Sequence, residues 1–562
     1  MKILIIDGYV DEPACLGVSP YISPYPRYIA GALCDRRVAE KDIHYVTIDG
    51  LRAHPRQFEK LIRSAEIVIV IAGSTVPGKY LNATPVKPDE IQSIFRAASG
   101  KKILGGPIHF GFAEEGGTIA KEFRAVDKDI TLVKGDIEAF IYDMVGKSQK
   151  ILDPETIEPR LRSIDEVGRW SIAGAFIVRQ HPRYPHIICE IETYRGCGRK
   201  THCSFCTENF YGKSEYRDVQ NVISEIKNLY DYGALHFRIG RQPDLFGFHA
   251  IDTGNVVPEP QPHIIELLYK GIRSSAPEIK TLHMDNVNPA TIKEYPEKSL
   301  EIIKTIVRYH TPGDVAALGM ESADPAVIKA NNLKAYPEDV LEAIKVINEV
   351  GQKRGYNGLP EFLPGINFVH GLPGETRKTY ELNYRFLQDI IDREYLLRRI
   401  NIRQVMAFPG TEIYSKKRSI NKNRKLFLKY KELIRKNIDL PMLRKVIPDG
   451  TVITDVICEH CEKGYTLARQ PASYPLIVKI PGEFPEGKVL NVAISGHKSR
   501  SITGIPCPLN INRASFKAIK EIPGIGKKQA MDIAANAPYK DKNDFLTRNS
   551  NGESIINYLE FE

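Results

Sequence analysis

Six strand-like runs occupy the middle of this 562-residue chain, and each is followed by a polar or glycine-rich turn and a helical stretch. Strands that alternate with helices in this way form a parallel α/β sheet. Six such units in series predict a partial or full parallel barrel, whose ligand site lies where the strands end. The runs read CEIETYRGC, LHFRIGRQ, KTLHMDNVN, VAALGMES, INFVHGLPGE and INIRQVMAFPG.

Three cysteines follow the first of these runs as Cys197, Cys203 and Cys206, in the spacing C-x5-C-x2-C. Three thiolates on one loop can bind three irons of a [4Fe–4S] cubane, because cysteine thiolate is the usual iron–sulfur ligand. The fourth iron then lacks a protein ligand and can bind a small molecule. A zinc site with His202 as the fourth ligand is the alternative. The spacing by itself leaves both interpretations open.

The cysteine loop resembles that of the radical S-adenosylmethionine (SAM) superfamily, which usually reads C-x3-C-x2-C with an aromatic residue before the last cysteine. The first interval is two residues longer here. The later strand ends match that family in order, so the resemblance covers about residues 190–412. It implies SAM contacts at Phe205, beside the adenine, and at Gly240, Arg241, Gln242, Asp285, Asn286, Glu321, Ser322, Gly371 and Gly374.

The chemistry implied by this resemblance is reductive cleavage of SAM. The open iron chelates the amino and carboxylate groups of SAM, and one electron breaks the C5′–S bond. The products are methionine and a 5′-deoxyadenosyl radical, which abstracts a hydrogen atom. The electron would come from a donor such as ferredoxin or flavodoxin. The protein orients the cofactor and excludes water from the reactive intermediate.

Residues 1–148 also alternate strand-like and helical runs, which predicts a doubly wound parallel sheet. The runs 25–33, 105–107 and 135–138 resemble the Rossmann-like, cobalamin-binding-like domain that precedes many radical SAM barrels. Its Asp-x-His-x-x-Gly signature, which supplies a cobalt ligand, is absent. The expectation is therefore a degenerate structural domain, with cobalamin binding as the alternative.

Methylthiotransferases share much of the barrel and end in a small antiparallel β-barrel of the TRAM type. Residues 448–506 resemble that barrel, notably in the closing run 497–504. Such barrels bind RNA through basic edges, which indicates Lys498 and Arg500 here, although a purely structural barrel is the alternative. Methylthiotransferases also carry a second cluster on three N-terminal cysteines. This N-terminal domain has only Cys15 and Cys34, so sulfur donation is not expected.

The last residues, 507–562, resemble a helix-hairpin-helix module around the turn at 522–526. Gly524 and Gly526 allow a tight turn whose backbone N–H groups can meet a phosphate at the start of the second helix. Lys527 and Lys528 add positive charge without sequence preference. Some such modules only mediate protein contacts, which is the alternative.

Nearly all of the net charge of +9 lies in residues 411–450, where 12 Lys and Arg face 4 Asp and Glu. This excess suits a polyanion, although a solvated helix face would give the same count. The N-terminal apolar run is interpreted as a buried strand rather than a signal peptide, and no run is long enough to span a bilayer. A cytoplasmic protein is expected.

The sequence therefore predicts a radical SAM enzyme that modifies a nucleic acid, RNA rather than DNA, with tRNA as the first candidate. One alternative is a radical SAM enzyme, cobalamin-assisted or not, that acts on a protein or small molecule. Another is a nucleic-acid-binding protein with a structural or sensing cluster. The predicted domains are a Rossmann-like domain (1–148), a linker (149–186), the radical SAM barrel (187–412), a basic helical connector (413–447), the TRAM-like barrel (448–506) and the helix-hairpin-helix domain (507–562).

Overall fold

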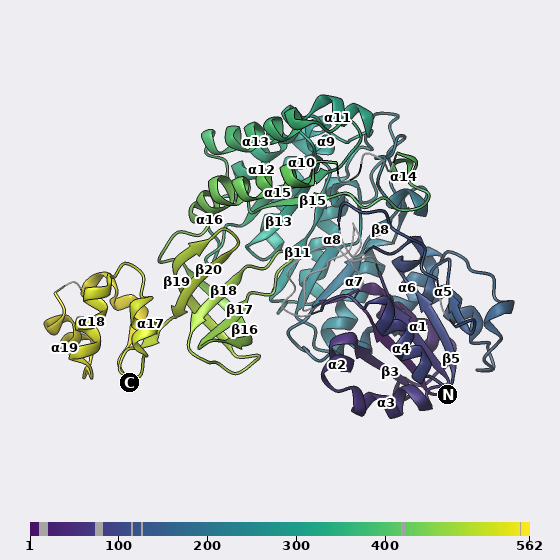
Figure 1. The fold of residues 1–562 in the computed structure, drawn as a ribbon, viewed down its shortest axis with the longest axis horizontal. Coiled ribbons are helices and arrows are strands. Elements are labelled where there is room, and N and C mark those ends of the chain that lie inside the picture. The colour runs from purple at the N-terminus through teal and green to yellow at the C-terminus, as the bar shows by residue number, and fades with distance from the viewer. Residues whose placement is uncertain are drawn as a thin grey trace.

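A computed structural model describes residues 1–9, 21–73, 83–113, 116–124, 127–416, 420, 422–550 and 552–562. Cys15 lies outside these residues. The chain forms two α/β units, a small β-barrel and a helical tail that projects from the barrel at the far end from the N-terminus (Figure 1). No helix among the described residues is long and apolar enough to cross a membrane.

The N-terminal unit is a five-stranded parallel sheet in the order β3-β1-β4-β5-β6. Alternate side chains of β1 enter two different cores, with Ile3 and Ile5 on one face and Leu4 and Ile6 on the other. Helices therefore cover both faces, as in a doubly wound fold. The strands are β1 (Ile3–Asp7), β3 (Ile43–Thr47), β4 (Ile67–Ile71), β5 (Lys101–Gly105) and β6 (Ile130–Leu132). The helices are α1 (Pro24–Asp35), α2 (Ile48–Ala53), α3 (Pro55–Ser64), α4 (Pro88–Ala97) and α5 (Ile137–Met144).

Residues 149–186, expected to be a linker, are packed against this unit. They contain α6 (Ile164–Ala173) and the short helix η4 (Ala175–Gln180). Trp170 is fully buried, and its carbonyl oxygen lies against Gly31 of α1. A side chain at Gly31 would collide with that oxygen, so the glycine permits the close approach of α1 and α6. Composition pointed to a connector, but Trp170 and Gly31 make the segment part of the core.

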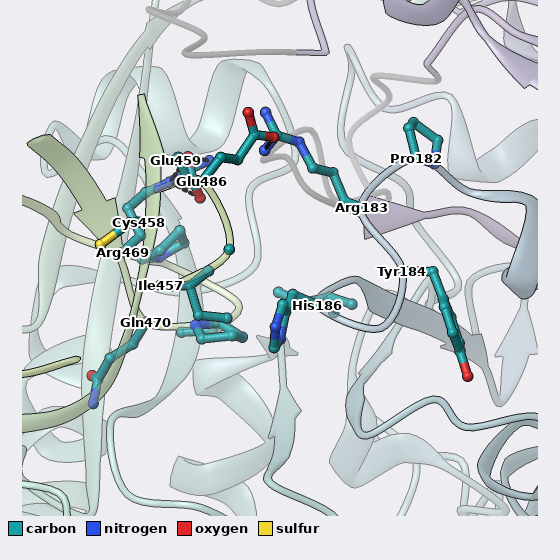
Figure 2. Close-up of a pocket in the computed structure, with 15 residues that line it drawn as sticks. Pro182, Arg183, Tyr184, His186, Ile457, Cys458, Glu459, Arg469, Gln470 and Glu486 are labelled. Atoms are coloured by element: carbon teal, nitrogen blue, oxygen red, sulfur yellow. Dashed lines mark hydrogen bonds and ion pairs between the residues drawn. The ribbon is translucent and has the colours of Figure 1, made fainter. Parts of the chain in front are cut away.

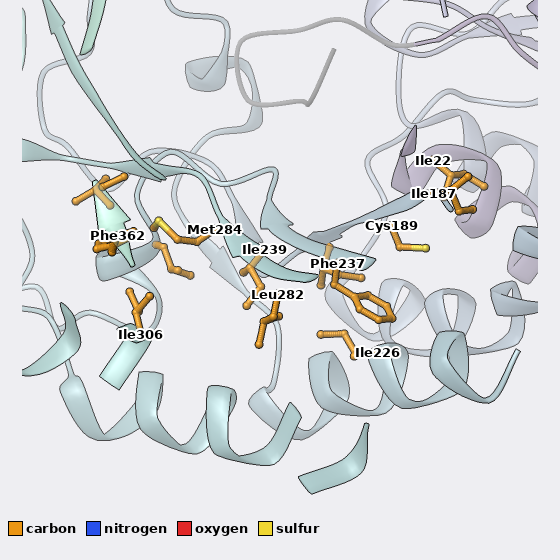
Figure 3. Packing of buried hydrophobic residues seen from close by; sticks show 14 of the residues in the cluster. Ile22, Ile187, Cys189, Ile226, Phe237, Ile239, Leu282, Met284, Ile306 and Phe362 are labelled. Atoms are coloured by element: carbon orange, nitrogen blue, oxygen red, sulfur yellow. The ribbon is translucent and has the colours of Figure 1, made fainter. Parts of the chain in front are cut away.

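The central unit is an open parallel array, as the series of strands predicted. One sheet has the order β11-β10-β7-β2 and the other β12-β13-β14-β15, and the two meet at Asp285, whose carbonyl accepts from the N–H of Ala317 at 2.9 Å. Phe237 and Ile239 pack toward the covering helices (Figure 3). The strands are β2 (Tyr21–Ile22), β7 (Ile188–Glu192), β10 (His236–Gly240), β11 (Thr281–Met284), β12 (Asn286–Val287), β13 (Asp314–Glu321), β14 (Phe362–His370) and β15 (Arg399–Gln404). The helices are α7 (Val219–Asp231), α8 (Pro262–Ser275), α9 (Pro289–Glu294), α10 (Pro296–Tyr309), α11 (Pro325–Ala330), α12 (Pro337–Gly351) and α13 (Arg377–Asp392).

The small barrel is closed, in the strand order β16-β17-β18-β20-β19. It was predicted to be antiparallel throughout, but β18 and β20 pair in parallel. The reason is that β19 pairs with both β16 and β20, which places β20 beside β18 in the same direction. The strands are β16 (Val452–Glu462), β17 (Tyr465–Arg469), β18 (Ile477–Pro481), β19 (Val489–Lys498) and β20 (Ser501–Pro506).

Two helical segments flank the barrel. The basic connector before it contains α14 (Glu412–Ser415), α15 (Arg424–Ile434), the π-helical turn η8 (Arg435–Asp439) and α16 (Leu440–Val446). The tail after it contains α17 (Phe516–Lys520), α18 (Lys527–Asn536), α19 (Lys542–Arg548) and the strand pair β21 (Leu509–Asn510) with β22 (Leu559–Glu560). The tail has its own apolar core, which also includes Ala493 and Ile505 of the barrel.

Candidate functional site

The cysteine loop leaves the carboxyl end of β7 and is held between two short antiparallel strands, β8 (Tyr194–Arg195) and β9 (Glu215–Tyr216). Gly196 begins the loop with φ +87° and donates its N–H to a carboxylate oxygen of Glu208 at 2.8 Å. A side chain at Gly196 would collide with the carbonyl oxygen of Lys213. The start of the loop is therefore tightly confined.

The second half of the loop is fixed by the segment between α11 and α12. Ser204 donates its N–H to the carbonyl of Asn331 at 3.0 Å and its hydroxyl to the side-chain oxygen of the same residue at 2.7 Å. Arg199 donates to the carbonyl oxygens of Asn332 and Leu333 and lies 3.2 Å from the sulfur of Cys203. Backbone and side-chain bonds thus position the loop from both ends.

The three thiols differ in exposure. Cys203 is buried in an apolar cluster, whereas Cys197 and Cys206 are half-buried. Phe205 packs against the same cluster. Among the described residues, no three His, Cys, Asp or Glu side chains are grouped to hold one metal ion, and the buried Nε2 atom of His202 has no hydrogen-bond partner. A cubane does not require such a group, because its thiolates bind different irons.

Glu321, at the end of β13, and Lys334, between α11 and α12, both interact electrostatically with the thiols. Glu321 ends β13 in the left-handed conformation, with φ +58°, and its buried Oε2 atom has no hydrogen-bond partner. A Cβ at Gly319 would lie 2.6 Å from Glu321 Oε1 and 3.0 Å from Lys334 Nζ, so only glycine leaves room for both groups. An ammonium and a carboxylate therefore converge beside the cysteine loop.

The charged groups beside the cysteine loop influence one another's pKa values. Burial raises the pKa of Cys203, and Glu321 adds to the rise, while Lys334 and Arg199 oppose it. Burial would lower the pKa of Lys334, but Glu321 and the three thiols together raise it above its ordinary value. Lys334 therefore stays protonated and stabilises negative charge on the thiols. The pKa of Cys203 nevertheless stays above its ordinary value, and burial raises the pKa of Cys206 as well, so metal binding is what would deprotonate these thiols.

The carboxyl end of β10 supplies Arg241 and Gln242. Arg241 has φ +57°, and its guanidinium lies between two tyrosine rings, with hydrogen bonds of 2.8 Å to the hydroxyl of Tyr25 and 3.3 Å to that of Tyr211. Gln242 is fully buried and donates to the carbonyl of Ile239 at 3.0 Å. Tyr25 belongs to α1, so the N-terminal unit contributes to this edge of the site.

Asp285 is engaged by the protein itself. One of its carboxylate oxygens pairs with Arg238 of β10, and the other accepts from the hydroxyl of Tyr474. Tyr474 comes from the small barrel, and Arg399 of β15 stacks on its ring at 3.7 Å. Asn286 donates to the carbonyl of Gln242 at 3.1 Å. These contacts join β10, β12, β15 and the small barrel around Asp285.

The remaining predicted positions shape the turns after β13 and β14. Ser322 is fully buried and accepts from the N–H of Asp324 at 3.1 Å. Gly371 and Gly374 both have φ +87°, a conformation that glycine adopts without strain. The N–H of Gly371 donates to the carboxylate of Glu375 at 2.9 Å. They form the turn rather than offering side chains to a ligand.

Sequence comparison identifies the family. Residues 191–387 match the radical SAM superfamily. These residues form a radical SAM domain. The enzyme is also 44% identical to an uncharacterized protein of Archaeoglobus fulgidus over 94% of this chain and 95% of that protein. It is 45% identical to an uncharacterized protein of Methanocaldococcus jannaschii over 90% of this chain and 93% of that protein.

Among solved structures, this radical SAM enzyme is similar to the radical S-adenosylmethionine methyltransferase TsrM of Kitasatospora setae. The two are 15% identical, the match covers 74% of this chain and 75% of that one, and the TM-score is 0.48. A radical SAM domain implies a [4Fe–4S] cluster and SAM as cofactors. The same domain makes the chain an enzyme rather than a binding protein with a structural cluster.

Sequence reasoning missed Arg199 and Lys334. Arg199 lies within the cysteine loop itself, two residues after Cys197, and its charge was a signal available in the sequence. Lys334 lies 13 residues after Glu321, between α11 and α12, and nothing in its local pattern marks it. Only the packing of that segment against the cysteine loop shows its role.

The predicted nucleic-acid contacts lie on the small barrel and the helical tail. Lys498 and Arg500 are exposed at the turn between β19 and β20. In the tail, Gly524 has φ +84°, and neither it nor Gly526 has any atom within 4 Å of where a Cβ would stand. Lys527 and Lys528 are exposed at the start of α18, so this helix terminus is open to a ligand.

Cobalamin binding stays a prediction. The crevice of a sheet in this order lies at the carboxyl ends of β1 and β4. Val86 fills part of it, since its N–H donates to the carbonyl of Gly8 at 2.8 Å and a Cβ at Gly8 would lie 2.4 Å from its side chain. Residues 10–20 and 74–82, which follow these strands, lie outside the described residues. No role in the reaction is derived for cobalamin.

A cavity of about 340 Å³ lies at the opposite ends of the central strands, between residues 182–188 and the small barrel (Figure 2). Glu459 and Arg469 form a buried ion pair of 2.8 Å on its wall, and Arg183 pairs with Glu486 at its rim. Cys458 also lines it, and burial raises the pKa of that thiol to about 11. Among the described residues, Cys458, Cys461 and Cys507 do not form a group that could hold a single metal ion.

Proposed function

We propose that Cys197, Cys203 and Cys206 hold the [4Fe–4S] cluster of this enzyme and that the cluster cleaves SAM reductively. The observation that carries this proposal is the convergence of Lys334 and Glu321 on the loop that bears the three thiols. When bound, the cluster supplies one electron to SAM, which yields methionine and a 5′-deoxyadenosyl radical. Zinc with His202 would leave the neighbouring charges without a role.

Lys334 and Glu321 divide the binding of SAM between them. The ammonium of Lys334 is suited to the carboxylate of SAM, because it is buried and close enough to all three thiols to interact with them electrostatically. The free Oε2 atom of Glu321 can accept from the amino group or a ribose hydroxyl. Gly319 leaves the space in which both groups meet the ligand. Phe205 lies at the apolar side, where an adenine ring can pack.

Water exclusion falls to the surrounding units. Tyr25 of the N-terminal unit lies over Arg241, and Tyr474 of the small barrel closes the interior from the other side through Asp285 and Arg399. A closed chamber protects a radical from quenching by solvent. The flanking units therefore complete the reaction chamber that the open array of strands leaves incomplete.

The proposed substrate is a nucleic acid, with tRNA as the first candidate. The basic connector, the exposed Lys498 and Arg500, and the open start of α18 would each meet phosphates. Phosphate contacts of this kind position a strand without reading its sequence. They support a long polyanion rather than a small molecule, because they are distributed over three separate parts of the chain.

The test of SAM cleavage is direct. Anaerobically reconstituted protein given dithionite and SAM is expected to release 5′-deoxyadenosine, measured by mass spectrometry. Cys206→Ala is expected to abolish the release, whereas Cys461→Ala, an exposed cysteine of the small barrel, serves as the matched control. No 5′-deoxyadenosine from a protein with an intact cluster would refute the proposal. The substrate class is tested by comparing modified tRNA nucleosides from cells with and without the gene.

A further inference from the structure

Buried charged side chains join the N-terminal unit to the strand that enters the cysteine loop. Asp136, at the start of α5, accepts a hydrogen bond of 2.6 Å from the guanidinium of Arg195. Arg195 stands two residues before Cys197 and is 2% exposed, and Asp136 is 6% exposed. A carboxylate of the N-terminal unit thus binds the side chain of a residue two positions before Cys197, a proposed cluster ligand.

Arg162, from the packed segment before β7, completes this network. Its backbone N–H donates to Asp136 at 2.7 Å, and its guanidinium lies 3.3 Å from the same carboxylate and 3.2 Å from that of Glu138. It also pairs with Glu192 of β7. Arg195 also donates a hydrogen bond of 2.9 Å to the backbone carbonyl of Arg162, which connects the two arginines directly. Two separate segments, the start of α5 and the segment that bears Arg162, therefore hold the guanidinium of Arg195.

The carboxylate of Asp136 does not cap the helix that it precedes. Asp136 is the N-cap of α5, where an aspartate side chain ordinarily accepts from the first helical N–H groups. It makes no such bond here. Burial opposes its charge, but Arg162 and Arg195 hold its pKa below the ordinary value. The carboxylate is thus dedicated to the two arginines.

A buried ion network of this kind is weak evidence for stability, because desolvation offsets most of the attraction. What such a network does provide is a defined geometry. Beyond Arg195 the chain is confined at Gly196, whose N–H is bonded to Glu208 and which packs closely against the carbonyl oxygen of Lys213. A displacement of Arg195 would therefore pass directly to Cys197.

We propose that Asp136 and Arg162 are positioning residues, through which the N-terminal unit sets the place of Cys197 in the cluster. This inference rests on the proposed function of the cysteine loop. It assigns the N-terminal unit a part in SAM cleavage whether or not that unit binds a ligand of its own. The expected consequence of disturbing it is a misplaced cluster within an intact fold.

The experiment compares Asp136→Asn with Asp143→Asn in the full-length, reconstituted protein. Asp143 lies on the same helix and pairs with Arg160 at 2.6 Å, but it is half-exposed and does not contact the strand before Cys197. Asp136→Asn is expected to lower kcat for 5′-deoxyadenosine release by about 10- to 100-fold, because a misplacement of 1 Å can cost that much. The midpoint potential and electron paramagnetic resonance spectrum of the cluster should shift with it, and Asp143→Asn should change neither.

Asp136→Glu keeps the carboxylate and is expected to recover part of the rate and the native spectrum. If Asp136→Asn does not fold, Arg195→Lys replaces it in the comparison. This variant keeps the positive charge but loses one of the two hydrogen bonds, to Asp136 or to the carbonyl of Arg162, and is expected to show the same change in rate and spectrum. A wild-type rate, potential and spectrum in the folded variant would overturn the inference. If the proposed function is wrong, the wild-type protein itself releases no 5′-deoxyadenosine. The spectra of the wild type and the variants still report the position of the cluster in that case, so the two failures can be told apart.

Discussion

Gly319 offers the sharpest perturbation of the proposed SAM site. In Gly319→Ala the new methyl carbon would stand 2.6 Å from Glu321 Oε1 and 3.0 Å from Lys334 Nζ. Both atoms are the ends of flexible side chains, so the backbone of β13 need not move. The fold is expected to accept the substitution, whereas the two charged groups must turn away from the place where they converge.

The size of the effect follows from the groups displaced. A hydrogen bond to a charged group contributes about 1.5–3 kcal/mol. Losing one such bond to SAM raises the dissociation constant roughly tenfold for each 1.4 kcal/mol, which predicts about a 10- to 100-fold weakening. The free energy of unfolding should change by less than about 1 kcal/mol, because no buried backbone atom is displaced.

The assay is calorimetric titration of SAM into the anaerobically reconstituted protein, together with thermal unfolding. Gly496→Ala is the matched control, because Gly496 also lies in a strand and its nearest neighbour to an added Cβ is 3.9 Å away. Equal SAM affinity in Gly319→Ala and the wild type would refute the assignment of Glu321 and Lys334. Weakened binding in the control would show that the effect is not local.

Three further predictions concern stability and nucleic-acid binding. Burial raises the pKa of Asp7 from 3.8 to about 6, so the folded protein favours the protonated carboxyl group. The stability that Asp7 contributes is therefore fully present below pH 3.8 and is lost as the pH rises through 6. In urea unfolding, Asp7→Asn should be more stable than the wild type by about 3 kcal/mol at pH 8 and equally stable near pH 3.5. Gly31→Ala places a methyl 1.9 Å from the carbonyl oxygen of Trp170 and is expected to destabilise the protein by about 3 kcal/mol, while an unchanged urea midpoint would contradict the packing of α1 on α6. The double change Lys527→Glu and Lys528→Glu should weaken RNA binding in fluorescence anisotropy and reduce the slope of log K against log salt by about 0.7 per lysine, and an unchanged slope would remove α18 from the interface.

The organisation of the central barrel could be predicted because its signals are local. Buried runs of β-branched residues alternate with helical stretches, and each strand ends in glycine or polar residues. The parallel array β7 to β15 confirms that prediction. Cysteine spacing is equally local, since Cys197, Cys203 and Cys206 lie on one loop. The small barrel and the helical tail were found for the same reason, although not the parallel pairing of β18 with β20.

The packing of residues 149–186 was not predictable from composition. Pro and Arg are frequent there, which is typical of a connector, but the position of Trp170 against Gly31 depends on a helix more than 130 residues earlier. The same limit applies to Asp285, which sequence motifs assign to SAM. Its partner Tyr474 comes from the small barrel, 189 residues later. A contact between two segments that are distant in the sequence leaves no periodic pattern in the sequence of either segment.

The sequence by itself determined the chemistry that the chain can perform, because three thiols on one loop and a series of strand ends are encoded within short windows. Tertiary structure decided which charges surround that loop. Lys334 reaches it from the α11–α12 segment, and Asp136 reaches Arg195 from the N-terminal unit. The physical reason is that electrostatic and hydrogen-bonded partners are chosen by distance in space, which only the folded chain defines.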